Sequence, residues 1–565
     1  MNFKVNPADG IPAEGAFNNS PREEKTKKPL GEHRDGRWVT PSHLNSTYVS
    51  PVHPFRAYRE RPENYDAFIR RSAALYPNRE AVVCGERRVT WAEFDLLIER
   101  TACGYTQAGL TPQDRVAVML DNRLEYLVAM MAAIRAGAIA IPLGTRLGAM
   151  DVDHILKDAQ PKIAVTAVEW LEKFKTASCP DHLYIVGEAT PGQLSFENLQ
   201  KSTSQSLPKL NVSDIAMIVY TSGTTGKPKG ACLTHLNFIH TCLHYLYALG
   251  IDQPLKSLLV VPGTHIAGFG PLVSVTMASG GTVVLSKEFK PTETLDLIVK
   301  ENVNYAVLVP AMYQLLAMKA PVEDYDLSSW VYGVYGGAIM PPATIERFSQ
   351  VAPGLRMINA YGATETCAVC TIMPPELTRL YPASVGLSLE CDDIEIMDEN
   401  GVPVAPGVSG ELWIRGPNVS PGYWNNTQAT EREFQNGYWK SGDVGHRDEN
   451  GLIYVSDRLK DMINRGGFKV FSAEVENSLM SHEDIDDCAV IGVPDSVLGE
   501  KTYAKISTRN DSLRGEALKA YLLARIADYK VPDFWSISSD PIPRNQNGKV
   551  QKAIIREIAN MALQK

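Results

Sequence analysis

The sequence predicts an α/β protein. Its large N-terminal domain would contain stacked α/β subdomains and a small barrel-like β subdomain, and a small mobile α+β domain would follow. From Asn64 onward helical and strand-like segments alternate, which is typical of largely parallel sheets covered by helices. After Val385 the strands become short and the turns carry Asp, Asn and Gly, which indicates a barrel-like sheet. From about Asp461 a separate set of elements begins. We therefore divide the chain into 1–50, 51–457 and 458–565.

The first segment, 1–50, is polar and rich in Pro, Asn, Glu and Lys, which predicts a mobile arm or one laid on the surface. Beyond it, the helix 90–108 has a clear start signal, since Thr90 and Glu93 have the spacing of a capping box. The apolar run 126–143 is interrupted by an arginine and a glycine, so we expect a helix, a turn and a buried strand instead of a membrane span. Expected helices are 66–75, 90–108, 126–136 and 152–158, and expected strands are 81–84, 115–120, 138–141 and 163–166.

The same alternation returns in the middle of the chain, where a helix is expected from Thr234 onward. Expected strands there are 215–220, 258–261, 282–285, 305–309 and 331–334. Farther along, the glycine-led segments 410–415 and 451–455 indicate antiparallel strands. In the last unit we expect helices at 472–480 and 514–527 and strands at 487–491 and near Phe534.

Bulk composition limits the possible functions. The chain has 565 residues, which indicates two to four structural units, and a net charge of −9, which argues against a nucleic-acid-binding protein. Nine thinly spread cysteines, with no secretory or transit peptide and no transmembrane segment, favour a cytoplasmic protein with reduced thiols. The pair Cys367 and Cys370 is expected to line an apolar wall, and His240 and His244 to lie on a packed or solvated helix face.

The segment 220–230, Tyr-Thr-Ser-Gly-Thr-Thr-Gly-Lys-Pro-Lys-Gly, is the strongest functional signal in the chain. Glycines let the backbone bend and bring its N–H groups close to a ligand, while hydroxyl and ammonium groups suit phosphate oxygens. The segment differs from the Walker A pattern, because Pro228 follows Lys227 where that pattern has Ser or Thr. We expect a mobile loop between a buried strand and a helix that binds a nucleoside triphosphate.

Five further motifs follow the loop in a fixed order. They are Tyr335-Gly-Gly-Ala338, Asn359-Ala-Tyr-Gly-Ala-Thr-Glu-Thr366, Tyr438-Trp-Lys-Ser-Gly-Asp-Val-Gly445, the charged turn and glycine pair within 457–470, and Pro543-Arg-Asn-Gln-Asn-Gly-Lys-Val550. With these motifs the chain resembles the adenylate-forming superfamily, which includes acyl-CoA synthetases, peptide-synthetase adenylation domains and beetle luciferases, and it is most similar to the acyl-CoA synthetases. The resemblance extends from about residue 60 to 560.

The resemblance implies a role for each motif in binding ATP. The loop would hold the β- and γ-phosphates, and Tyr361 would stack on the adenine. Asp443 would accept hydrogen bonds from the ribose hydroxyls, with Arg458 assisting. The residues implied in the loop are Thr221, Ser222, Gly223, Thr224, Thr225, Gly226, Lys227 and Lys229, and those implied at the adenine are Gly336, Gly337 and Ala338.

The resemblance also implies how the reaction proceeds. Thr364 would contact the α-phosphate, Glu365 would hold Mg²⁺, and Lys549 would reach the acid carboxylate and the α-phosphate. Such cations neutralise charge where it develops as a carboxylate attacks the α-phosphate. The small domain would then turn about Lys460, so that the face with Gly466 and Gly467 admits the pantetheine arm of coenzyme A. Those two glycines could equally form only a hairpin turn.

The acid-binding site is implied near 262–268, the helix from Thr234, and the bend after Tyr361. The first of these segments has no acidic residue, which disfavours an amino-acid substrate, and its His265 would flank the carboxylate entrance or simply pack. Small residues in the bend, Ala363, Cys367 and Ala368, favour a neutral medium-chain, alicyclic or aromatic acid. Coenzyme A is the expected acceptor. A carrier-protein thiol, an amine acceptor, or a non-catalytic nucleotide-binding module remain the alternatives.

Overall fold

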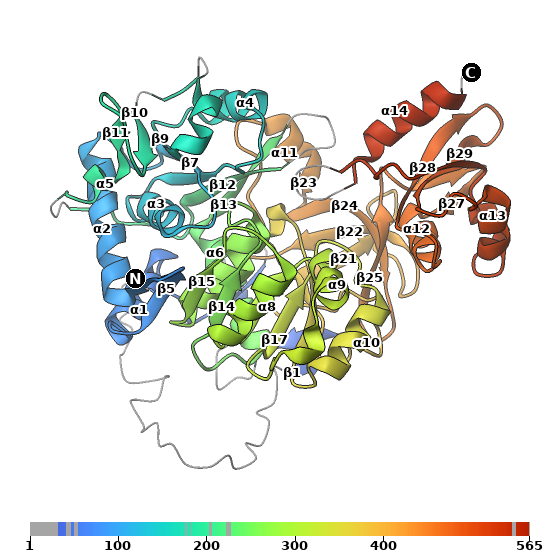
Figure 1. The fold of residues 1–565 in the computed structure, drawn as a ribbon, viewed down its shortest axis with the longest axis horizontal. Helices are drawn as coiled ribbons and strands as arrows, with labels where there is room; N and C mark the ends of the chain where they lie inside the picture. Colours follow the sequence, from blue (N-terminus) through green and yellow to red (C-terminus); the bar gives the residue numbers. More distant parts are fainter. Residues whose placement is uncertain are drawn as a thin grey trace, which may run out of the picture.

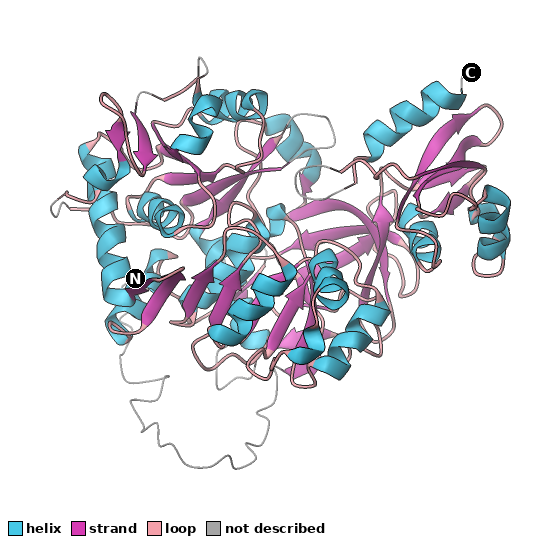
Figure 2. Cartoon of the chain, in the orientation of Figure 1, coloured by secondary structure: helices cyan, strands magenta, loops and turns pink. Residues whose placement is uncertain are grey.

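The computed structural model describes residues 32–34, 36–40, 47–49, 55–175, 178–180, 182–202, 206–221, 228–544 and 550–563. Figure 1 shows a large body formed by the blue to orange part of the chain and a smaller orange-red unit that carries the C-terminus. Helices cover the sheets of the large body, as the secondary-structure colouring of Figure 2 makes clear. Within the described ranges, no helix combines the length and apolar character that crossing a membrane requires. The predicted α/β class is confirmed.

A mostly parallel sheet of seven described strands forms the upper left of Figure 1, in the order β11-β10-β9-β7-β8-β12-β13. Its strands β7, β8 and β9 are parallel, whereas β12 and β13 are antiparallel to each other. The strands are β7 Arg115–Met119, β8 Ile139–Pro142, β9 Ile163–Ala167, β10 His182–Val186, β11 Leu194–Ser195, β12 Ile215–Thr221 and β13 Lys229–Thr234.

The helices near this sheet follow the predicted apolar patterns. The helix α2 begins with the predicted capping box, because the Thr90 hydroxyl accepts from the backbone N–H of Glu93 and the Glu93 carboxylate accepts from that of Thr90. The helix α3 is buried at almost every position, which explains its nearly continuous apolar sequence. The helices are α1 Asp66–Leu75, α2 Trp91–Gln107, α3 Leu124–Arg135, α4 Ala149–Ala159, α5 Phe196–Leu199 and α6 His235–Ala248.

A second sheet of eleven described strands has the order β1-β2-β20-β19-β18-β17-β16-β14-β15-β5-β6. Its central strands β5 and β14–β18 are parallel, as the βα alternation predicts. Its strands are β1 Glu32–Arg34, β2 Arg37–Val39, β5 Glu80–Cys84, β6 Arg87–Thr90, β14 Lys256–Leu259, β15 Thr282–Leu285, β16 Tyr305–Leu308, β17 Tyr332–Tyr335, β18 Arg356–Tyr361, β19 Thr371–Ile372 and β20 Leu387–Ser388. Helices along this part of the chain are α7 Val275–Ala278, α8 Pro291–Lys300, α9 Pro310–Lys319 and α10 Pro342–Val351.

Where the sequence predicts short antiparallel strands, the structure has an antiparallel sheet of five described strands. Strand β24 lies at its centre and pairs with β22, β23 and β25. The elements are β21 Asp393–Met397, β22 Gly410–Arg415, α11 Thr427–Glu433, β23 Phe434–Gln435, β24 Tyr438–Arg447 and β25 Ile453–Arg458. Because β25 includes Arg458, that residue belongs to the large body, one residue beyond the predicted boundary after 457.

The smaller unit has its own sheet and core. The sheet order is β27-β26-β29-β28, with β30 beside β29. Its elements are β26 Ile463–Arg465, β27 Phe468–Val470, α12 Ser472–Met480, β28 Asp487–Asp495, β29 Gly499–Ser507, α13 Gly515–Leu523, β30 Phe534–Ser538 and α14 Lys552–Leu563. Apolar residues of α12, α13, β28 and β29 form a separate buried cluster, as expected of an independent α+β unit.

The predicted polar arm needs a correction. Strands β1 and β2 extend the edge of the eleven-stranded sheet, and β3 Thr47–Val49 pairs with β4 Arg56–Tyr58. Trp38 in β2 is 2% exposed, and its indole N–H donates to the carbonyl of Ile372 at 2.7 Å. Of the two expectations for 1–50, a mobile arm or one laid on the surface, the mobile arm fails for 32–34 and 36–40, because one buried tryptophan and main-chain pairing anchor a segment of polar composition.

Candidate active site

The glycine-rich loop joins two antiparallel strands, β12 and β13. Thr221 pairs with Lys229 across this hairpin, and its hydroxyl donates to the Lys229 carbonyl at 3.5 Å. The loop residues Ser222, Gly223, Thr224, Thr225, Gly226 and Lys227 lie outside the described residues. The predicted connection from strand to helix is wrong, because 230–234 continues as a buried strand before α6 begins at His235. Helix α6 therefore cannot point its N-terminal N–H groups at a ligand in the loop.

The segment that carries Tyr423 covers the edge strand β13. Tyr423 forms an antiparallel bridge with Ala231, and the Trp424 N–H donates to the Gly230 carbonyl at 2.7 Å. This pairing places the Tyr423 ring next to Lys229, whose ammonium lies 4.1 Å from the ring centroid. Lys229 is thus held on an aromatic face at the base of the hairpin.

Lys229 forms an ion pair with a residue that sequence reasoning missed. Its Nζ lies 2.9 Å from Oε1 and 2.8 Å from Oε2 of Glu433, the last residue of α11. The Lys229 side chain is only 12% exposed, so solvent screens this pair weakly. Burial raises the pKa of the Glu433 carboxyl, but the hydrogen bonds from Lys229 and Tyr423 outweigh it and lower the pKa overall.

The Tyr423 hydroxyl connects Glu433 to Glu365, the carboxylate predicted to hold Mg²⁺. Its oxygen lies 2.8 Å from Glu365 Oε1 and 2.6 Å from Glu433 Oε2. Glu365 is 8% exposed, and this burial raises the pKa of its carboxyl. We call Lys229, Glu433, Tyr423 and Glu365 the phosphate-side cluster.

A second cluster forms around Asp443, which is 3% exposed. The Tyr361 hydroxyl donates to Asp443 Oδ2 at 2.5 Å, and Arg458 Nε lies 2.6 Å from Asp443 Oδ1. Asp443 and Arg458 are register partners on β24 and β25, and the Arg458 guanidinium also donates to the Ser441 carbonyl at 3.2 Å. The structure thus joins three predicted site residues directly. We call Tyr361, Asp443 and Arg458 the ribose-side cluster.

The predicted adenine segment lies at the exit of β17, next to β18, which ends at Tyr361. A Cβ at Gly336 would lie 2.2 Å from the Ala360 carbonyl oxygen, so only glycine fits there. Gly337 has φ +78°, a conformation that glycine adopts without strain, and Ala338 follows it as an exposed residue. Gly336 therefore lies against the residue that precedes Tyr361 of the ribose-side cluster, and the role of the three residues at the adenine stays a prediction.

The predicted acid-binding segments also meet. Thr364 opens a short 3₁₀ turn, and the following Cys367 and Ala368 have φ of 48° and 88°, which is unusual for residues with a side chain. A Cβ at Gly270 would lie 3.4 Å from the Ala368 side chain, so this bend faces the π-helical segment Gly268–Ser274. His265 is half-buried, and burial, then the charge of Arg146, lowers its pKa.

The remaining predicted residues lie in the smaller unit or just before it. Gly466 and Gly467 form the two-residue turn between β26 and β27, with φ of 61° and 90°. Lys460 is exposed between β25 and β26, and its carbonyl accepts from Arg556 of α14 at 3.3 Å. These local contacts place all three outside the two clusters. Lys549 lies outside the described residues.

His240, His244, Cys367 and Cys370 lie in the packed interior. His240 is fully buried, and its Nε2 accepts from the backbone N–H of Tyr58 at 3.3 Å. His244, Cys367 and Cys370 are also buried. Among the residues that the structure describes, no group of three His, Cys, Asp or Glu side chains is arranged to hold a metal ion. The expectation of packed histidines and an apolar thiol wall agrees with this burial.

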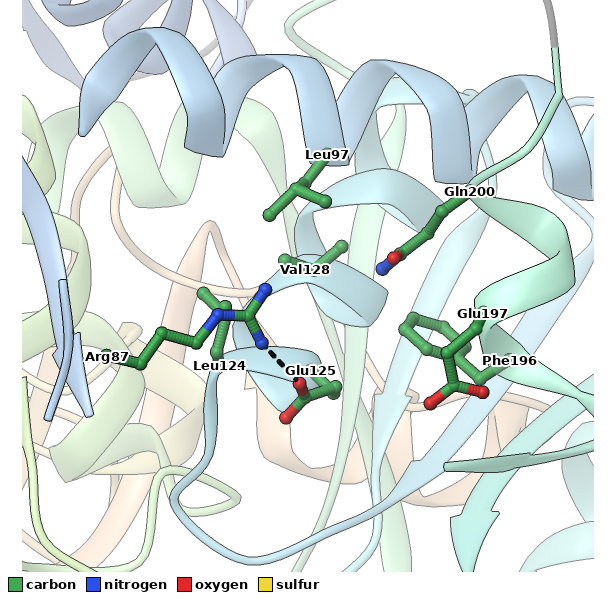
Figure 3. A pocket seen from close by; sticks show the side chains of 8 residues that line it. All are labelled: Arg87, Leu97, Leu124, Glu125, Val128, Phe196, Glu197 and Gln200. Carbon is green, nitrogen blue, oxygen red and sulfur yellow. Dashed lines mark hydrogen bonds and ion pairs between the residues drawn. The ribbon is translucent and has the colours of Figure 1, made fainter. Parts of the chain in front are cut away.

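One further hollow, of about 150 Å³, lies between α2, α3 and α5 (Figure 3). The Arg87–Glu125 ion pair, at 3.1 Å, lies on one side, and Phe196 and Gln200 on another. Its lining includes none of the predicted site residues. We therefore do not connect it with the two clusters.

Comparison with known proteins identifies the family. The family model of the AMP-binding enzymes matches residues 69–424, and that of the AMP-binding enzyme C-terminal domain matches 474–549. A feruloyl-CoA synthase of Amycolatopsis sp is 34% identical over 487 residues, covering 86% of this chain and 97% of that enzyme. An indoleacetate–CoA ligase of Aromatoleum aromaticum is 31% identical over 502 residues, covering 87% and 97%.

A solved structure shows the same fold. It is the o-succinylbenzoate CoA synthetase of Bacillus subtilis in complex with the acyl-adenylate intermediate OSB-AMP, which aligns with a TM-score of 0.79 and 27% identity over 88% of this chain and 98% of that chain. The prediction of an adenylate-forming enzyme, most similar to acyl-CoA synthetases, is confirmed. The chain belongs to the AMP-binding enzyme family.

Proposed function

We propose that this protein is an acid:CoA ligase that works in two steps. In the first, a carboxylate oxygen attacks the α-phosphorus of ATP, and the bond to the departing pyrophosphate breaks, which leaves acyl-AMP. In the second, the thiol of coenzyme A attacks the acyl carbon, loses its proton and displaces AMP. The relatives named as CoA synthases and ligases support this reading.

The ribose-side cluster would bind the nucleoside. Asp443 is buried and held by Arg458 and Tyr361, so its carboxylate is pre-oriented toward the ribose hydroxyls that it would bind. The hydrogen bond from the Tyr361 hydroxyl also fixes the tyrosine ring, which favours stacking on adenine. Gly336, Gly337 and Ala338 would let the backbone approach the base.

The phosphate side would neutralise developing charge. Residues Thr221 to Lys229 would contact the β- and γ-phosphates, and Thr364 the α-phosphate. Glu365 offers the carboxylate oxygens that Mg²⁺ prefers, with substrate phosphates as further ligands. Bound there, Mg²⁺ would withdraw charge from the phosphate oxygens as a Lewis acid. Each such electrostatic contact contributes roughly 3–4 kcal/mol to lowering the barrier.

The acid is proposed to be neutral and aromatic. The bend at Ala363, Cys367 and Ala368 offers small side chains, and Gly270 packs closely against it. Relatives named for feruloyl, indoleacetate and o-succinylbenzoate groups favour an aromatic acid over the medium-chain and alicyclic alternatives. His265 would flank the carboxylate entrance as a neutral imidazole.

The smaller unit is proposed to serve the two steps differently. Lys549 would act in adenylation, and a turn about Lys460 would then bring Gly466 and Gly467 to the pantetheine arm. Lys549→Ala should abolish acid-dependent pyrophosphate release but spare thioester formation from supplied acyl-AMP, whereas Gly467→Phe should do the reverse. Both reactions are followed on the same two variants. Equal loss of both steps in Lys549→Ala would contradict its role, and normal thioester formation in Gly467→Phe would contradict the pantetheine slot.

The observation that carries the proposal is the junction of Tyr361, Asp443 and Arg458, with the Arg458 charge acting on Glu365, in a chain of this family. We would test it with a panel of carboxylic acids and ATP, with pyrophosphate as the readout, with and without coenzyme A. We expect pyrophosphate release with aromatic acids and an acyl-CoA product. Release without acyl-CoA would favour a carrier-protein or amine acceptor. Nucleotide binding without release would favour a non-catalytic module.

A further inference from the structure

The Lys229 ammonium is already neutralised in this structure. Both carboxylate oxygens of Glu433 lie within 2.9 Å of it, and the Tyr423 ring covers it. Yet Lys229 stands at the base of the hairpin whose loop is the proposed polyphosphate site. An incoming polyphosphate would therefore meet a Lys229 ammonium that is already paired with the Glu433 carboxylate. The carboxylate and the polyphosphate would compete for this one cation, and each would weaken the other's ion pair with it.

The contacts allow Lys229 to change partners. Lysine is a point charge on a flexible four-carbon stem, so its ammonium, which lies 4.1 Å from the centroid of the Tyr423 ring, can turn from Glu433 toward a phosphate while the backbone stays in place. Glu433 would not be left alone, because Arg432 Nη2 lies 2.6 Å from its Oε1 and the Tyr423 hydroxyl 2.6 Å from its Oε2. The carboxylate keeps the Arg432 cation after Lys229 leaves, and it shares the single proton of the Tyr423 hydroxyl with Glu365.

We propose that Glu433 is an internal competitor for the polyphosphate: it holds Lys229 while the site is empty and releases the ammonium to the phosphates of ATP. Glu433 then lowers the affinity for polyphosphates without touching them. It is a positioning residue that acts through Lys229. This inference rests on the proposed binding of ATP at the hairpin, and it adds a residue that sets how tightly ATP binds.

The test uses the full-length protein and Glu433→Gln, which keeps the shape but removes the charge. Binding of Mg-ATP, pyrophosphate and AMP is measured by calorimetry without acid. We expect ATP and pyrophosphate to bind roughly three- to tenfold more tightly, as for loss of a partly buried competing charge, and AMP to bind unchanged. Glu431→Gln is the matched control, because Glu431 lies exposed on the same helix.

A second background separates competition from a general charge effect. In Lys229→Met the Glu433→Gln gain should vanish, because no ammonium remains to release. Glu433→Asp, which is one methylene shorter, should give a smaller gain and serves if the glutamine variant does not fold. Equal or weaker ATP binding in Glu433→Gln, an equal gain for AMP, or a full gain without Lys229 would each overturn the inference. Wild-type protein that binds no ATP would instead contradict the proposed function.

Discussion

The two clusters of the candidate active site differ in how the chain builds them. In the ribose-side cluster, Asp443 and Arg458 are register partners in one pair of adjacent strands, and Tyr361 ends the strand β18. The phosphate-side cluster joins three stretches that are far apart in the sequence, and Lys229 and Glu433 are 204 positions apart. The first is therefore visible as short motifs, whereas the second exists only after β13 and the segment before α11 have paired. We infer that a substitution in the ribose-side cluster will affect only its direct partners. A substitution in the phosphate-side cluster will also affect residues that are connected to it through further hydrogen bonds and ion pairs.

The largest effect is expected at Glu365. Glu365→Gln keeps the length and can still contact the Tyr423 hydroxyl, but it removes the charge proposed to hold Mg²⁺. Acid-dependent pyrophosphate release should fall roughly 10²–10³-fold, and half-saturation should require more Mg²⁺. The rate is measured across a magnesium titration, with thermal unfolding as the check on folding. An unchanged rate and magnesium dependence would remove Glu365 from the metal site.

A smaller effect is expected on the ribose side. Asp443→Asn removes the buried charge that Arg458 faces and weakens acceptance of the ribose hydroxyls. The KM for ATP should rise roughly 10- to 100-fold, the range for hydrogen bonds to a charged group, with little change in magnesium dependence. Glu449→Gln, an exposed change in the β24–β25 turn, is the control. If Asp443→Asn altered magnesium dependence as strongly as Glu365→Gln, the division into two clusters would fail.

The smallest effect concerns stability and tests whether His235, the first residue of α6, is buried as a neutral histidine. Burial lowers the pKa of His235 to about 4, and its Nδ1 accepts from the Tyr65 N–H. In the unfolded chain His235 takes up a proton with the ordinary pKa of about 6.5, whereas in the folded chain it does so only near pH 4. The free energy of unfolding therefore falls as the pH drops from 6.5 toward 4. Between pH 7 and pH 5 this histidine should cost about 2 kcal/mol of unfolding free energy. In His235→Asn, the drop in unfolding free energy between pH 7 and pH 5, measured by urea unfolding, should be smaller than in the wild type by about that amount. An identical drop in both proteins would contradict a neutral, buried His235.

Much of the fold could be predicted, because apolar periodicity indicates helices such as α1, α2 and α12, and the Thr90 cap marks the start of α2. Other elements could not. Strand β13 has only five residues after Lys229, too few for a clear pattern. Its formation depends on pairing with β12, which the sequence of β13 alone does not predict. The N-terminal strands are held chiefly by Trp38 and main-chain bonds within a polar segment.

The same limit applies to the site. Asp443, Arg458 and Tyr361 lie in recognisable motifs, so their grouping was predictable. Tyr423 and Glu433 were missed, because a glutamate at the end of a short exposed helix carries no signal of its own. Only the bridge between Ala231 and Tyr423 shows why that helix end reaches Lys229.

The most direct test of the account is isotope exchange between labelled pyrophosphate and ATP, catalysed by the purified full-length protein. With a panel of aromatic acids and Mg²⁺ but no coenzyme A, we expect exchange that depends on the acid and falls sharply in Glu365→Gln. No exchange with any acid, by protein that is folded and binds ATP, would contradict the claim that these two clusters activate a carboxylic acid as its adenylate.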